Sequence, residues 1–153
     1  MRNICLILII GLLTLGCKNP KEKQENKLPE VNYAVGLDFI NDYVHTKEGD
    51  KFIQTHELVT QTFKDRYQVI IDSALQKDPE IGLGFDPVID GQDFPSKFKI
   101  KAVDSTNTYL TLESDDKNWS NFDIVVKLIN QKNQTMVDGA GIINIPQNLQ
   151  PKR

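Results

Sequence analysis

The stretch Lys97-Phe98-Lys99-Ile100-Lys101-Ala102 places an apolar residue at every second position. Successive side chains of a strand point to opposite faces of a sheet. The alternation therefore predicts a half-buried strand with its lysines outward and its apolar side chains inward. Apolar residues recur at helical spacing before this stretch and at a spacing of two after it. This change of period predicts helices followed by a sheet, which makes an α+β domain.

Three further strands are expected after the first, over residues 108–113, 122–128 and 136–145. Polar segments separate them and are typical of turns. In the last strand, Gly139 and Gly141 indicate a bulge or a bend. The four strands together predict a mostly antiparallel meander.

Two helical segments are expected before the sheet. Asn32 is the expected N-cap of the first. Its apolar stripe consists of Tyr33, Leu37, Ile40 and Val44. Glu48-Gly49-Asp50 ends this helix. The second segment ends at Asp78-Pro79, because the residue before a proline avoids the helical region. It forms either one helix or two helices broken near residues 64–66, and residues 80–96 are expected to be a loop.

The N-terminus carries the most specific signal in the chain. Residues 4–15 are an apolar run, shorter than the roughly 20 residues that cross a bilayer and typical of the hydrophobic region of a signal peptide. Thr14-Leu15-Gly16-Cys17 follows and resembles the lipobox of bacterial lipoprotein precursors. The resemblance implies that residues 1–16 are removed and that the thiol of Cys17 receives the lipid.

Residues 17–30 are expected to be a disordered tether, because residues 18–27 contain no apolar side chain to bury. A flexible coil of this length spans about 20 Å. The lipoprotein resemblance favours the outer membrane, because inner-membrane lipoproteins usually carry Asp where Lys18 stands. The tether lacks a dense acidic cluster, which favours the periplasmic face.

The remaining chain is expected to be one α+β domain over residues 31–148, with a polar tail at 149–153. A length of 153 residues is typical of a single domain. The formal charge of −3 argues against a nucleic-acid partner. Two cysteines are too few for a disulfide framework. Phosphate loops, zinc-ligand sets and nucleophile elbows do not occur in the sequence, and no cofactor is expected.

The order of helices, loop and meander resembles the nuclear-transport-factor-like, or cystatin-like, superfamily over about residues 31–145. The resemblance implies a cone of helices packed on a strongly bent sheet, a fold compatible with a homodimer. Gly84-Phe85-Asp86-Pro87-Val88-Ile89-Asp90-Gly91-Gln92-Asp93-Phe94-Pro95 is similar to the Asp-Pro…Gln-Asp segment of a family of small Gram-negative lipoproteins and periplasmic proteins. That family is a domain of unknown function and brings no established activity.

Asp86, Asp90, Gln92 and Asp93 place three carboxylates and an amide within eight residues. The aspartates could cap turns of their own loop. They could instead contact a ligand or a partner, or hold a hard cation such as Ca²⁺. The spacing is not that of the twelve-residue calcium loop. Turn capping is therefore the favoured interpretation, and no metal is expected.

The two histidines are candidates for acid–base chemistry. His45 would form a catalytic set with Asp86 and Asp90 in the pocket of the cone, if the protein is an enzyme. A solvated position is the simpler interpretation for both His45 and His56. Trp119 is expected either in the core or as an exposed contact residue.

Two further features concern the surface. Lys97, Lys99 and Lys101 form a basic stripe, which either meets anionic headgroups or a partner, or protects a sheet face or edge from pairing. Ser73 and Ser105 each follow an aspartate and resemble the short O-glycosylation signal of Bacteroidota.

Three functions stay open. The first, which the lack of a catalytic motif favours, is a non-enzymatic, lipid-anchored binding module of the cell envelope. It would use the sheet and the loop over residues 80–95 to contact an envelope protein or a small molecule. The second is a small enzyme with acid–base residues in the cone pocket. The third is an immunity protein that inhibits a toxin, which the compartment and the acidic charge permit.

We predict that the protein made in a Gram-negative host begins at Cys17 and carries acyl chains on this residue. Intact-mass spectrometry should show the loss of residues 1–16 and the added mass of lipid. A Cys17→Ser variant should show neither change, because serine offers no thiol. A bare sulfur on residue 17 of the wild-type protein would contradict the anchor.

Overall fold

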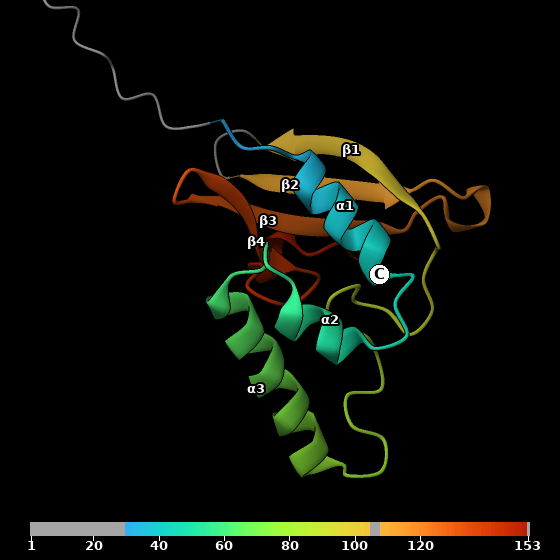
Figure 1. The fold of residues 1–153 in the computed structure, drawn as a ribbon. Helices are drawn as coiled ribbons and strands as arrows, with labels where there is room; N and C mark the ends of the chain where they lie inside the picture. Colours follow the sequence, from blue (N-terminus) through green and yellow to red (C-terminus); the bar gives the residue numbers. More distant parts are fainter. Residues whose placement is uncertain (1–29, 105–107, 153) are drawn as a thin grey trace, which may run out of the picture.

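The computed structural model describes residues 30–104 and 108–152 (Figure 1). Three helices precede a four-stranded sheet, and the expected α+β class is confirmed. The elements are α1 (Ala34–Tyr43), α2 (Gly49–Thr55), α3 (Gln61–Lys77), β1 (Phe98–Asp104), β2 (Tyr109–Ser114), β3 (Asp123–Gln131) and β4 (Gln134–Ala140), with two short 3₁₀ helices, η1 (Lys117–Trp119) and η2 (Gln147–Leu149). Cys17, most of the expected tether and Ser105 lie outside the described residues.

The four strands form the predicted meander, in the order β1-β2-β3-β4 with every pairing antiparallel. Between β3 and β4 the chain turns over Lys132 and Asn133, whose φ angles of 51° and 65° suit the right-handed twist of a hairpin. The last strand ends at Ala140 rather than at Ile145. Gly141 follows it with a φ of 59° and turns the chain back.

The inner face of the sheet is covered most closely by α1. Its buried residues are Gly36, Phe39, Ile40 and Tyr43. The predicted stripe is therefore partly wrong, because Tyr33, Leu37 and Val44 flank this face and are only half-buried. Gly36 explains the shift. A Cβ there would lie 3.0 Å from a methyl group of Leu110, so the glycine lets the helix backbone approach the sheet.

The break between α2 and α3 falls just before Thr60, whereas residues 64–66 lie inside α3. The Oγ1 of Thr60 accepts a hydrogen bond from the backbone N–H of Phe63 (3.1 Å) and caps α3. The segment before α3 pairs with β4. The N–H group of Val137 donates to the carbonyl of Leu58 (2.7 Å), and the carbonyl of Val137 accepts from the N–H group of Thr60 (3.0 Å). The break therefore covers one edge of the sheet.

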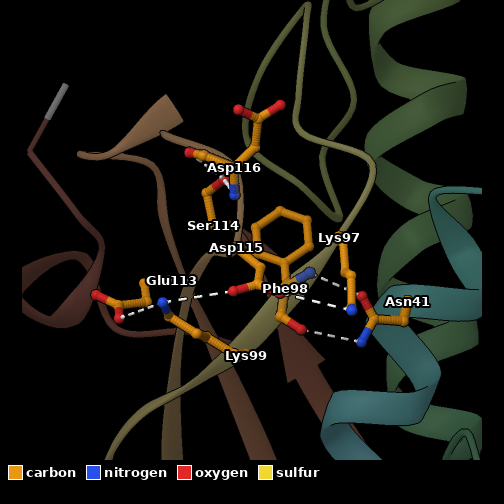
Figure 2. A network of polar contacts seen from close by, with 8 residues as sticks. All are labelled: Asn41, Lys97, Phe98, Lys99, Glu113, Ser114, Asp115 and Asp116. Atoms are coloured by element: carbon orange, nitrogen blue, oxygen red, sulfur yellow. Dashed lines mark hydrogen bonds and ion pairs between the residues drawn. The ribbon is translucent and has the colours of Figure 1, made fainter. Parts of the chain in front are cut away.

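The opposite edge is β1, and here the predicted burial is wrong beyond Phe98. Ile100 is 42% exposed and Ala102 is exposed, because an edge strand has a neighbour on one side only. The pairing with β2 also shifts at Lys101, which forms a bulge. At the start of β1, the side-chain amide of Asn41 accepts from Phe98 N–H (2.8 Å) and donates to Phe98 C=O (3.2 Å; Figure 2).

The basic stripe of Lys97, Lys99 and Lys101 is paired with carboxylates of β2, β3 and the loop after β2, and Figure 2 shows the pairs of Lys97 and Lys99. The ion pairs are Lys97–Asp115 (3.5 Å), Lys99–Glu113 (3.6 Å), Lys99–Asp115 (3.4 Å) and Lys101–Asp123 (2.6 Å). Exposed pairs of this kind add little to stability, because water and salt screen them. Their main consequence is a face without excess positive charge, which supports edge protection rather than anion binding.

The turn at residues 86–91 docks on the end of β4. Val88 and Ile89 are fully buried in the core. The backbone N–H of Ile142 donates to the carbonyl of Pro87 (3.0 Å). A Cβ on Gly141 would lie 2.4 Å from that same carbonyl oxygen, so this contact requires a glycine.

We predict that Gly141→Ala lowers the free energy of unfolding by more than about 2 kcal/mol, because it adds a clash to a left-handed φ. Gly84→Ala is the matched control. Gly84 also has a positive φ (72°), but its Cβ would meet only a methyl group of Ile81 at 3.8 Å. It should cost about 1 kcal/mol. Urea unfolding followed by Trp119 fluorescence measures both; equal losses would contradict the docking contact.

Candidate functional site

A polar cavity of about 530 Å³ lies between the helices and the turn at residues 86–91. Its lining residues are Tyr43, Lys47, Glu48, Gly49, Asp50, Lys51, Tyr67 and Asp86. The lining residues come from the three helices, the connection between α1 and α2, and the turn. The cavity is therefore the place where these five segments meet.

Asp86 links the turn to α1. The hydroxyl of Tyr43 donates to Asp86 Oδ2 (2.7 Å). Asp86 Oδ1 accepts from the backbone N–H groups of Val88 (2.8 Å) and Ile89 (3.1 Å). Both carboxylate oxygens are thus engaged in holding the turn. This geometry supports the turn-capping interpretation of Asp86.

A second tyrosine–aspartate pair links α3 to α2, because the hydroxyl of Tyr67 donates to Asp50 Oδ1. Burial raises the pKa of both Tyr67 and Tyr43 far above the usual range, and their carboxylate neighbours add to the shift. Both phenols stay protonated and act as donors. Burial also raises the pKa of Asp86, although the bonds from Tyr43 and from the turn lower it.

The three residues of the expected catalytic set are not brought together. The exposed His45 lies just past α1, with its Nδ1 2.6 Å from the carbonyl of Asn41. Asp90 sits in the turn with a φ of 58°, and its backbone N–H donates to Asp86 C=O (2.7 Å). Of the three, only Asp86 lines the cavity.

His56 is the C-cap of α2. Its Nδ1 accepts from the backbone N–H of Leu58 (3.2 Å). The ring packs edge-on against Phe39 at a centroid distance of 5.5 Å, and against Phe52 at 5.0 Å. Burial lowers the pKa of this half-buried histidine. It is therefore part of the aromatic packing, and the expectation of a solvated side chain is wrong.

The other expected contact residues lie apart from the cavity. The amide of Gln92 donates to Gly84 C=O (3.0 Å) and closes the loop, and Asp93 is exposed. Trp119 is half-buried and packs edge-on against Phe122 (5.5 Å). Within residues 30–104 and 108–152, no group of three or more His, Cys, Asp or Glu side chains is placed to hold a metal ion.

An apolar groove of about 370 Å³ is the second candidate. It runs between the C-terminal half of α3 and the chain that follows it. The lining residues are Arg66, Val69, Ile70, Ser73, Ala74, Lys77, Asp78, Gly82 and Leu83. The stripe that buries Phe63 and Tyr67 continues along α3 as Ile70 and Ala74, which are only half-buried. Figure 1 shows that this half of α3 projects beyond the sheet.

Comparisons with known proteins do not assign the chain to a family. A scan against family models found no match, and a search of curated proteins found no similar sequence. In the part of the chain that the structure describes, no helix is both long and apolar enough to cross a bilayer.

We predict opposite effects for two substitutions of Asp86. Asp86→Ala should cost about 1–3 kcal/mol of unfolding free energy at pH 7, because buried donors lose their acceptor. Asp86→Asn keeps an oxygen that accepts from the turn, and its NH2 group can donate to the Tyr43 hydroxyl oxygen, so that bond reverses its direction. The variant carries no buried charge. It should be at least as stable as the wild-type protein at pH 7.

The same pair defines a pH dependence. Because the pKa of Asp86 is raised on folding, its contribution to stability is fully present below about pH 4 and is lost as the pH rises through the folded value. The stability of the wild-type protein relative to Asp86→Asn should therefore fall from pH 4 towards pH 7. Urea unfolding at several pH values measures this difference. If the stability of the wild-type protein relative to Asp86→Asn instead rises with pH, the hydrogen bonds to the Asp86 carboxylate outweigh the effect of its burial.

Proposed function

We propose that this protein is a lipid-anchored binding module of the cell envelope, without catalytic activity, that contacts a partner through the groove beside α3. The observation that supports this most directly is the exposed apolar surface at this end of the molecule. Val69 is 52% exposed, Leu75 is 46% exposed and Ile81 is 71% exposed. Exposed apolar side chains are costly in water, and where they gather they mark interaction sites. Of these three residues, Val69 lines the groove itself.

The position of the groove suits an anchored protein. Figure 1 shows that the start of the described chain, drawn in blue before α1, lies at the opposite end of the molecule from the loop that follows α3. The lipobox resemblance predicts an anchor at Cys17, which precedes this end of the described chain in the sequence. The groove would then open away from the point of attachment, where a partner can reach it.

The cavity gives weaker support to an enzyme. A general base needs a free oxygen near its substrate. Asp86 has both oxygens bonded to the protein itself, and neither His45 nor Asp90 lines the cavity. The carboxylate of Asp86 instead links the turn at residues 86–91 to α1.

The proposed contact surface is not the one expected from the sequence, which consisted of the sheet and the loop over residues 80–95. The turn at residues 86–91 is held against the core, and the lysine stripe of β1 is neutralised. The chain just after α3 is the part of the expected loop that borders an open groove.

Site-specific photo-crosslinking in living cells tests the proposal. A photoreactive amino acid at Val69 should give a crosslinked product of one defined mass, because this residue lines the groove. Gln68 is the matched control. It is exposed on the same helix, and one step of about 100° turns its side chain away from Val69. Equal labelling from both positions, or only the uncrosslinked monomer from position 69, would contradict the proposal.

A further inference from the structure

The charges around the groove restrict what can fill it. Arg66 and Lys77 lie on the groove side of α3, three helical turns or about 16 Å apart along the axis. No ion pair is found for either of them among the described residues. Asp78 lies beside Lys77, but its Oδ1 already accepts from the N–H groups of Glu80 and Ile81 (both 3.1 Å). The apolar groove therefore has an unpaired cation at each end.

The walls of the groove restrict the backbone of the occupant. One wall is α3, whose backbone groups are bonded within the helix. The other contains Gly82, whose N–H donates to Asp78 C=O (2.8 Å). Neither wall is a strand of the sheet. An extended peptide would leave its own N–H and C=O groups without partners there, whereas a helix satisfies them internally.

From these observations we infer that the groove binds a helical segment of another protein, with an apolar face between two carboxylates about three turns apart. This inference rests on the proposed function and names the class of partner. The carboxylates would pair with Arg66 and Lys77. The apolar face would cover Val69, Ile70 and Ala74.

Two other occupants fit the charges less well. An acyl chain carries its anionic group at one end only, so one cation would stay unpaired. A second copy of this chain, packed with its α3 antiparallel and centred on the groove, would place Arg66 of one copy opposite Lys77 of the other. Like charges in contact are destabilising.

Two synthetic peptides test the inference. Both are helical, fluorescein-labelled and about 18 residues long, or five turns. They share one leucine-rich face and differ only in carrying Glu or Lys at two positions eleven residues apart. The protein is the acylated full chain in lipid nanodiscs. We expect the Glu peptide to bind about tenfold more tightly than the Lys peptide by fluorescence anisotropy, because two exposed pairs change from repulsive to attractive.

The double variant Arg66→Glu with Lys77→Glu should reverse this preference. Lys117→Glu with Lys152→Glu is the matched control, because it changes the net charge equally at exposed positions away from the groove and should keep the preference. Unfolding curves verify that both variants fold. Equal binding of the two peptides, or a preference that survives the groove variant, would overturn the inference.

The crosslinking experiment separates this inference from the function on which it rests. If position 69 still gives a defined product while the peptides show no charge preference, the groove binds a partner of another class. A crosslinked product from position 69 that is a dimer of this chain would contradict the inference of a helical partner. A fatty acid that lipid extraction releases from the groove would contradict it too. Loss of both the crosslink and peptide binding would also remove the proposed function.

Discussion

The inner face of the sheet is apolar along β2, β3 and β4, and three segments outside the sheet keep it from water. Gly36 lets α1 lie directly on the strands, the turn after α3 inserts Val88 and Ile89, and the start of α3 adds Phe63 and Tyr67. The covering ends before α3 does, because seventeen residues extend over roughly 25 Å. The groove lies beside the C-terminal half of α3, which extends beyond the core.

The order of the elements could be predicted from local pattern, because helical and strand periods are properties of short stretches. The burial of side chains at the edges of the sheet could not be predicted in this way. Ile100 has the pattern of a core residue, yet it belongs to a strand with one neighbour. The break before Thr60 depends on the pairing of this segment with Val137, which is remote in the sequence. Both differences come from contacts that no local window contains.

The candidate site shows the same division. Capping by Asp86 is a contact with residues two and three positions later, and it could be predicted from turn chemistry. Its bond with Tyr43 spans 43 positions, and the bond between Tyr67 and Asp50 spans 17. In the sequence, Tyr67 looks like one more apolar member of a helix face. The role of the two tyrosines could not be predicted, because it depends on the fold, which places their hydroxyls beside two carboxylates that are remote in the sequence.

Both edges of the sheet carry features that hinder strand addition, and the features differ between the two edges. Leu58 and Thr60 occupy the backbone groups of Val137 on β4, while the bulge at Lys101 and the amide of Asn41 disrupt the row on β1. A protein tied to a bilayer is confined to two dimensions, where its copies meet at a high effective concentration. Under the proposed lipid anchor, such edges would oppose polymerisation on a crowded membrane, while the proposed contact surface beside α3 would stay accessible.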